Sequence, residues 1–240
     1  VTFNQASTLG GLKGSRNLDG GNQDLTVGAN NTNQTYSGNL SGVPTLTKTG
    51  SGTWTLTGTS TVTHLFPRAG TLEIASGGNV TATGYSGPGL DNGDVGSLLV
   101  SGTGWVDVNG DFNVSDRAGS TGRLYIQDSA WVEGNNTWVG KSANTLGEAF
   151  QSGGTMNVNG ELRMAQDSTS VGHYTLSDGT LSVSSSMFVG YNGTATLGVT
   201  GGTINVTNGL MVWNGSGRID IGQDAGKTTQ VNTNWLTLGQ

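Results

Sequence analysis

The stretch GGTINVTNGLMVWNGSG, residues 201–217, holds no charged residue, no histidine and no cysteine. Polar and apolar residues alternate along both of its halves, and an Asn-Gly pair at 208–209 separates them. Alternation with a period of two indicates β-strands with one buried face, and Asn-Gly favours a tight turn. The stretch therefore predicts two short strands joined by a turn.

Similar blocks recur through the second half of the chain and place one small residue in register. The blocks are WVDVNG (105–110), TMNVNG (155–160), TLSVSS (180–185) and TINVTNG (203–209). The column that they define is Val108, Gly134, Val158, Val183, Val206 and Val231, with steps of 26, 24, 25, 23 and 25 residues. A fixed period of this length is the signature of a repeat architecture.

Two further strand-like columns keep the same period. One runs from DFNVSD (111–116) to LTLG (236–239), and the other from LLVS (98–101) to IDI (219–221). Three short strands per coil of about 25 residues predict an all-β fold, a parallel β-helix or β-solenoid. The usual chirality of parallel crossovers makes it right-handed. Coils rising by about 4.8 Å each give a rod of roughly 45 Å for about nine coils.

The chain is expected to form one body over residues 1–240. Residues 1–75 alternate with looser spacing and predict irregular N-terminal coils, which either cap the solenoid or continue it, whereas residues 76–240 predict regular coils. The glycine-rich segment 84–96 is expected to interrupt them. The pattern is still running at NWLTLGQ (234–240), so a fragment of a longer protein is expected.

Composition excludes several classes of function. A formal net charge of −6 with only 10 Lys and Arg argues against nucleic acid or an anionic membrane as a partner. Two histidines and no cysteine argue against zinc, and GLDNGDVG (89–96) lacks the ligand spacing of a calcium loop. No cofactor or metal is expected. No apolar run reaches the roughly 18 residues of a membrane-spanning helix.

Two parts of the chain carry a family resemblance. YSGNLSGVPTLTKTGSGTWTLTGTSTVT (36–63) with AGTLEI (69–74) resembles the passenger-associated repeat of type V secretion autotransporters. From about residue 97, units such as SDGTLSVSSSMFVGYNGTATLGVTGG (177–202) are similar to the repeat of autotransporters and PEP-CTERM surface proteins. The resemblance implies an extracellular β-helical stalk on the outer-membrane surface of Gram-negative bacteria, often an adhesin or biofilm protein. HLFPR (64–68) departs from the repeat.

Column parity places a patch of two tryptophans and two carboxylates on the outer surface. Trp105 and Asp107 are expected to face outward from one coil, with Trp131 and Glu133 at the equivalent places of the next. Aromatic faces beside hydrogen-bond acceptors suit a sugar. Carboxylates about 5 Å apart also match the separation in a retaining glycosidase. The alternative is that the rings stack on each other and the acids are solvated.

A second outward column predicts an apolar stripe along the rod. Its expected members are Asn113, Trp138, Arg163, Phe188, Met211 and Thr237, of which Trp138, Arg163, Phe188 and Met211 are the candidate protein-contact ladder. Such residue types are enriched at the centres of interfaces. The alternative is that segments 141–148 and 165–172 of the same chain cover them.

His64, Leu65 and Phe66 form a third candidate, a protruding turn that contacts a partner. Together these features predict a non-enzymatic surface adhesin or structural stalk. Its partners would be further copies, host or matrix proteins, or glycans, and many weak contacts would add along its length. A carbohydrate-binding or carbohydrate-active β-helix and a spacer without ligand are the alternatives.

Overall fold

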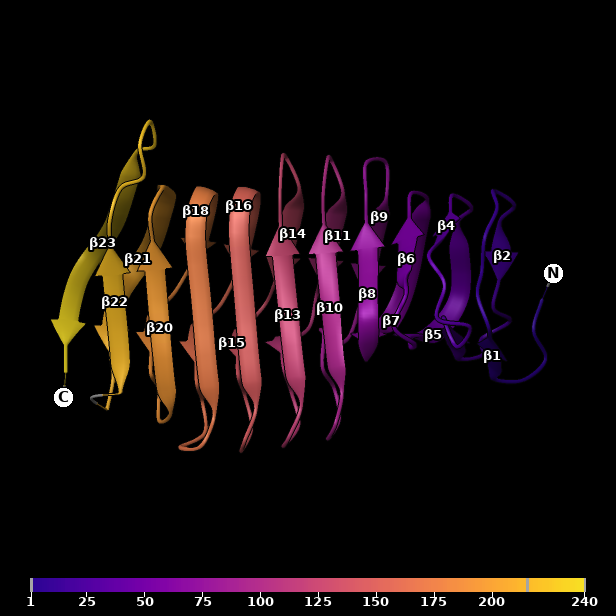
Figure 1. Ribbon diagram of the computed structural model, residues 1–240, viewed down its shortest axis with the longest axis horizontal. Coiled ribbons are helices and arrows are strands. Elements are labelled where there is room, and N and C mark those ends of the chain that lie inside the picture. The colour runs from indigo at the N-terminus through magenta and orange to yellow at the C-terminus, as the bar shows by residue number, and fades with distance from the viewer. Residues whose placement is uncertain (1, 215, 240) are drawn as a thin grey trace.

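The computed structural model describes residues 2–214 and 216–239. Every regular element within them is a β-strand, and all strand pairs are parallel. The strands stack into a β-solenoid of about nine turns, roughly 25 residues apart. The coils advance along one axis from the N-terminal to the C-terminal end with a right-handed sense (Figure 1). The predicted fold class is confirmed.

Each coil contributes strands to three sheets, which we number in the order in which the chain passes through them. The first sheet contains β4 (Gln34–Tyr36), β6 (Thr53–Leu56), β8 (Ala69–Ile74), β10 (Val95–Val100), β13 (Thr121–Ile126), the first halves of β16 (Leu146–Val158) and β18 (Val171–Val183), β20 (Thr194–Val199) and β22 (Gly217–Ile221).

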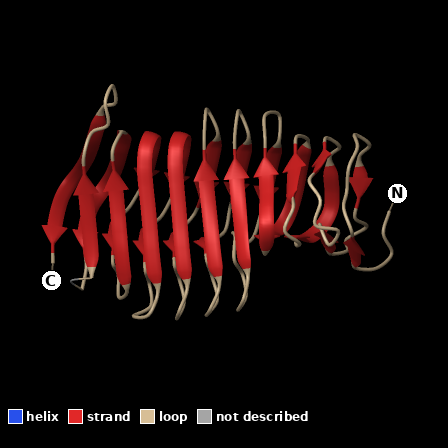
Figure 2. Ribbon diagram, in the orientation of Figure 1, coloured by secondary structure: helices blue, strands red, loops and turns tan. Residues whose placement is uncertain are grey.

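The second sheet contains β2 (Leu18–Asp19), the starts of β5 (Leu40–Lys48) and β7 (Thr59–Pro67), β9 (Asn79–Ala82), β11 (Trp105–Val108), β14 (Trp131–Gly134), the ends of β16 and β18, and the starts of β21 (Gly202–Val212) and β23 (Thr229–Leu238). The third sheet contains β1 (Ser7–Leu9), β3 (Leu25–Val27), the ends of β5 and β7, β12 (Phe112–Val114), β15 (Thr137–Val139), β17 (Leu162–Met164), β19 (Met187–Val189), and the ends of β21 and β23. Figure 2 shows strands connected only by turns and loops.

The valine column holds for five of its six members. Val108 pairs with Gly134, which pairs with Val158, and the pairing continues through Val183 to Val206. The next partner is Thr233, however, and Val231 pairs with Ile204. The prediction for Val231 was therefore wrong by two residues. Alternation with a period of two keeps both positions on the inner face, so sequence pattern alone does not separate them.

The core is a narrow channel along the axis, filled by the inward residues of all three sheets. Val100 and Ile126 occupy one inward column in adjacent coils and are almost completely buried. The next place in that column belongs to Gln151, whose amide nitrogen donates to the carbonyls of Gly154 and Thr180. Tyr174 donates its hydroxyl hydrogen to the Gln151 amide oxygen at 2.7 Å. The buried polar groups of Gln151 and Tyr174 are therefore hydrogen-bonded.

The N-terminal coils are shorter but belong to the same stack. Leu25 pairs with Leu46, 21 residues on, and Leu46 pairs with Leu65 after 19 more. In this region Lys48 is 1% exposed, and its ammonium donates to the carbonyls of Thr49, Gly50 and Ala69. Residues 2–75 thus continue the solenoid with coils of about 20 residues.

Segment 84–94 follows the third sheet instead of interrupting it, contrary to the sequence prediction. Ser86 forms a parallel bridge with Phe112, and the amide of Gly87 donates to the carbonyl of Leu65. The segment therefore fills the place between the end of β7 and β12. The segment occupies the place of a strand, but its backbone is not that of a strand, because Gly87 at φ +145° and Gly89 at φ +72° depart from the extended conformation.

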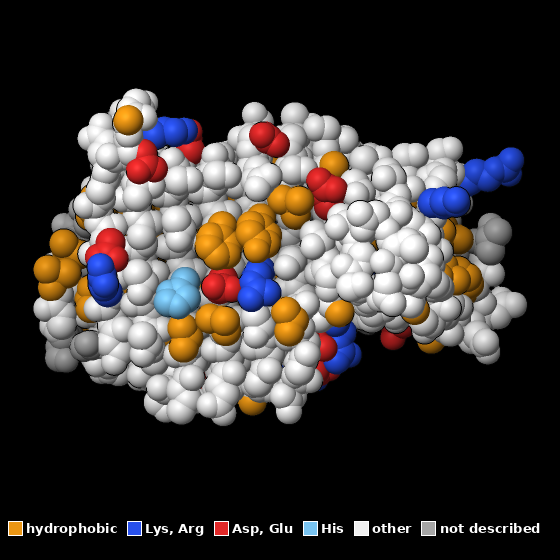
Figure 3. All heavy atoms as spheres, in the orientation of Figure 1, with side chains coloured by type: hydrophobic (Ala, Val, Ile, Leu, Met, Phe, Trp, Pro, Cys, Tyr) orange, Lys and Arg blue, Asp and Glu red, His pale blue; other side chains and the backbone are white. Residues whose placement is uncertain are grey.

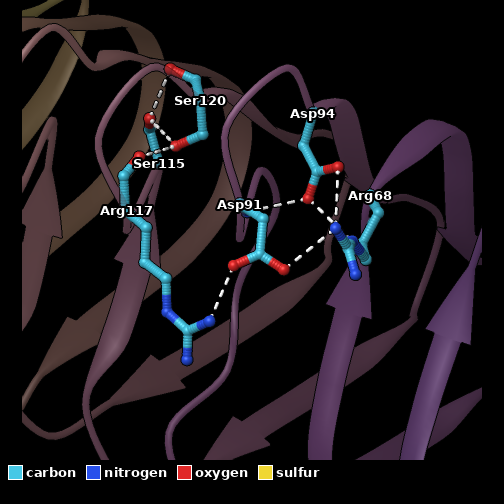
Figure 4. Close-up of polar contacts among 6 residues, drawn as sticks. All are labelled: Arg68, Asp91, Asp94, Ser115, Arg117 and Ser120. Carbon is cyan, nitrogen blue, oxygen red and sulfur yellow. Dashed lines mark hydrogen bonds and ion pairs between the residues drawn. The ribbon is translucent and has the colours of Figure 1, made fainter.

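Ion pairs hold the outer part of this segment in place (Figure 4). Arg68 lies 2.8 Å from Asp94 and 2.9 Å from Asp91, and Arg117 reaches Asp91 at 2.7 Å. The hydrogen bond to Asp94 is the main cause of a raised pKa at Arg68. Nearby, Ser115 and Ser120 join the following turn through a hydroxyl contact of 2.8 Å.

Candidate binding faces

The tryptophan pair lies on the outer face of the second sheet, where the sequence placed it. Trp105 pairs with Trp131, and Asp107 with Glu133. The two indoles stack with their centroids 4.8 Å apart and their planes 8° from parallel. Trp105 is 38% exposed. Each ring therefore covers one face of the other, and only the outward faces and the edges are open to a ligand.

The carboxylates beside the rings are engaged to different degrees. Glu133 accepts hydrogen bonds from the indole nitrogen of Trp131 at 3.2 Å and from the Asn159 amide at 2.7 Å. Burial, followed by the charge of Glu133, raises the pKa of Asp107. The two acids stand side by side on one sheet face. A glycosidase needs its two carboxylates on either side of the scissile bond.

The third-sheet column has the predicted register but not the predicted exposure. Asn113, Trp138, Arg163, Phe188, Met211 and Thr237 pair in succession. Met211 is only 5% exposed, so its place in an exposed ladder was wrong; it is enclosed between Phe188 and Thr237 of the adjacent strands. Asn113 is also buried.

The remaining ladder residues are half-buried in contacts with their own chain. The Lys141 ammonium lies 4.8 Å from the Trp138 ring centroid. Arg163 lies over the rings of Tyr191 and Phe188 at 4.6 and 5.9 Å, and it forms an ion pair with Glu161. The alternative, in which other parts of the same chain cover the ladder, therefore holds for Trp138 and Arg163.

Sequence reasoning missed two aromatic residues of this cluster. Tyr191 and Trp213 lie just beyond β19 and β21, and their rings are 14° from parallel at 6.3 Å. Phe188 meets both of them edge-on. The recurrence of an aromatic residue one or two positions after a third-sheet strand was the available signal.

His64, Leu65 and Phe66 do not form a protruding turn. They lie within β7, where Leu65 is 1% and Phe66 5% exposed. Leu65 is part of the inward column with Leu46, and the His64 ring contacts Phe66 and Tyr85. Pro67 is the last residue of β7, so the three residues belong to a strand that ends directly after them.

The outer face of the first sheet carries a patch that the sequence reasoning did not single out. Tyr125 on β13 and Phe150 on β16 stack at 5.2 Å. Beside them Arg123 forms an ion pair with Glu148 at 2.8 Å, and His173 is next in the same row. Figure 3 shows this charged row crossing the face between two groups of apolar side chains. Alternation within the strands at 98–101 and 124–127 predicts which of their side chains point outward, and those side chains would have indicated the patch.

We call this surface the first-sheet patch and define it by three outward rows. The outer apolar row is Val95, Thr121, Leu146 and Val171; the charged row is Ser97, Arg123, Glu148 and His173; the inner apolar row is Leu99, Tyr125, Phe150 and Thr175. Val95 is 52% exposed, and the others are half-buried. Rows of this kind exist because the register does not shift between these coils.

Two classes of feature are missing from residues 2–214 and 216–239. They hold no group of three or more His, Cys, Asp or Glu side chains that could bind a metal ion. They also hold no helix long and apolar enough to cross a membrane. Comparison with protein-family models, with curated proteins and with solved structures finds no match.

Proposed function

We propose that the chain is a non-enzymatic structural stalk that mediates adhesion through rows of side chains on its flat faces. The first-sheet patch is the observation that carries this proposal. Contiguous apolar rows on a solvent-facing sheet indicate an interaction surface, and a rigid solenoid holds them in a fixed line. Many weak contacts along such a rod add up when several rods meet.

The resemblance to autotransporter passenger repeats supports a place for this stalk outside the cell, on a bacterial outer-membrane surface. The polar outer positions agree with that proposal. The narrow core is built from coils of Val, Leu and Ile without a disulfide, since the chain has no cysteine. Self-association, biofilm formation and binding to host or matrix are the roles in which such a stalk acts.

The experiment is an adhesion assay with beads that carry the protein at one terminus. Beads coated with the wild-type chain should clump or bind a matrix surface. Beads coated with Tyr125→Ser/Phe150→Ser should do so at least several-fold less. Trp105→Ser/Trp131→Ser is the matched control, because it removes another stacked aromatic pair from a different sheet. Wild-type beads that bind neither one another nor any matrix protein or glycan would refute the adhesive role.

A carbohydrate contact at the tryptophan pair is the second candidate, favoured by the exposure of Trp105 beside two acidic residues. A glycan panel tests it: binding that is lost in Trp105→Ser and kept in Tyr125→Ser/Phe150→Ser supports this contact. Release of reducing ends or unsaturated sugars from a polysaccharide, abolished by Asp107→Asn, would instead make the protein an enzyme.

A further inference from the structure

The first-sheet patch has a symmetry that its individual residues do not show. Two sheets that pack face to face can be related by a two-fold axis lying between them, parallel to the strands. Rotation about that axis reverses the order of the coils but keeps each outward row opposite itself. An axis between β13 and β16 therefore sets each residue of β13 opposite its register partner on β16 of a second copy.

That operation makes the central charged and aromatic pairs complementary, whereas Thr121 lies opposite Leu146. Arg123 meets Glu148 of the second copy, and Glu148 meets Arg123. Tyr125 meets Phe150, and the outermost apolar residues Val95 and Val171 meet each other. We propose that two copies of this chain associate through the first-sheet patch, antiparallel along the rod, about a two-fold axis between β13 and β16. This inference rests on the proposed adhesive function and names its partner.

The charged row is suited to such a contact. Side chains of Arg123 and Glu148 are 31% and 21% exposed while paired within one chain. Both retain solvent-facing hydrogen-bonding capacity, so a second copy extends one ion pair into an alternating set of four charges. Removing water from the apolar rows on either side strengthens those contacts, because the local dielectric constant falls.

The other two sheets lack this property. On the second sheet the same rotation between β11 and β14 sets Asp107 opposite Glu133 of the second copy, and like charges repel. On the third sheet Arg163 already has Glu161 and two aromatic rings of its own chain around it. Only the first sheet combines opposite charges with open apolar rows.

The size of the face predicts the strength of the contact. Four coils about 4.8 Å apart and strands of six residues give roughly 380 Å² of flat face per copy. An interface of that size falls in the weak or transient class. The contact is centred on the axis, which is where Arg123, Glu148, Tyr125 and Phe150 lie. A micromolar or weaker dimer is therefore expected.

A charge-swap experiment tests the geometry directly. In the Arg123→Glu variant, positions 123 and 148 of the charged row are both acidic. In the Glu148→Arg variant, both positions are basic. Each variant alone should be monomeric in sedimentation velocity at concentrations where the wild type dimerises. An equimolar mixture should dimerise again, because each acid of one chain then faces a base of the other. Circular dichroism and thermal melting check that both variants fold.

Glu133→Arg serves as the control, since it changes net charge by the same two units on the second sheet and should leave dimerisation intact. A mixture of the two variants that stays monomeric while the wild type dimerises overturns the proposed geometry but leaves adhesion standing. A wild type that stays monomeric at millimolar concentration overturns self-association through this face. Bead binding to matrix or glycan then decides the proposed function separately.

Discussion

Tyr174 places a hydroxyl group in the middle of an otherwise apolar column. Its ring is almost completely buried, and its hydroxyl group has one partner, the amide oxygen of Gln151. Gln151 in turn satisfies two backbone carbonyls where β16 bends, at the register shift after Gln151. The pair therefore stabilises the corner between the first and second sheets. Burial raises the pKa of Tyr174.

Tyr174→Phe should lower the free energy of unfolding by about 1–3 kcal/mol, because it leaves the Gln151 amide oxygen buried without a donor. Urea denaturation measures the loss. In a double-mutant cycle with Gln151→Leu the two effects should be non-additive by at least about 0.5 kcal/mol. Strict additivity would show that the hydrogen bond contributes nothing to stability.

The same tyrosine makes stability depend on pH at the alkaline end. Its pKa is higher in the folded chain than the ordinary value of about 10. The folded state thus retains a proton that the unfolded state loses, and stability should fall as pH rises above about 10. Comparing wild type with Tyr174→Phe at pH 9.5 and 11 measures this residue's share, and equal losses in the two proteins would contradict it.

At some single positions the alternation pattern identifies the column but does not explain which residue occupies it. Gly134 stands in a valine column, and a Cβ atom there would lie 2.8 Å from the Cβ of Phe112. Phe112 takes the space that valine fills in other coils. The alternation identified the column, but only the packing of a neighbouring strand explains the residue. The segment from His64 to Phe66 departs from the repeat motif, yet it continues β7 as far as Pro67.

At the scale of elements, Lys48 links two backbone segments of the N-terminal coils. Its ammonium donates to carbonyls that follow β5 and begin β8. Burial lowers the pKa of Lys48 to about 8, against 10.5 for an exposed lysine. Between these values the unfolded chain binds a proton that the folded chain does not, so stability should rise with pH through this window.

The rise should amount to roughly 1–2 kcal/mol between pH 7.5 and 9.5. Urea midpoints at the two pH values measure it, with Lys48→Met as the comparison. The variant should show no such gain, because it has no titrating group at this place. A gain of equal size in both proteins would assign the effect to other groups.

Strand columns were predictable from sequence because every inward residue in the regular coils follows the same alternation. Exposure was less predictable, since it depends on what crosses the outer face. The rings of Tyr191 and Trp213, for example, pack around Phe188. The first-sheet patch was not predicted because it depends on how the coils stack. Its charged and apolar residues look ordinary in each strand and form a pattern only when coils are stacked.

For the whole molecule, burial depends on position along the axis as well as on direction. Leu210 and Leu236 share one inward column, yet Leu210 is 1% exposed and Leu236 is 53% exposed in the outermost coil of this chain. Ile221 and Leu238 are exposed there as well. Inward direction buries a side chain only where coils lie on both sides of it.

Replacement of these two leucines by aspartate should therefore have unequal effects. Leu210→Asp places a charge in the core and should unfold the chain or cost several kcal/mol. Leu236→Asp should cost under about 1 kcal/mol, because the new carboxylate reaches water. Thermal melting of the two variants measures the difference, and a comparable loss in both would mean that the last coil is as well packed as the interior.

The constant register between coils also determines how the length of such a solenoid can change. Leu146 pairs with Val171 and Val158 pairs with Val183, so deletion of residues 146–170 would bring each later residue to the place of its equivalent one turn earlier. Loss of an odd number of residues within a strand would turn its inward side chains to water. Gain or loss of whole repeats instead alters length in steps of about 4.8 Å. In the proposed stalk, the distance from an anchoring point to a binding partner would thus be inherited as a repeat number, which recombination can adjust without redesigning a single contact.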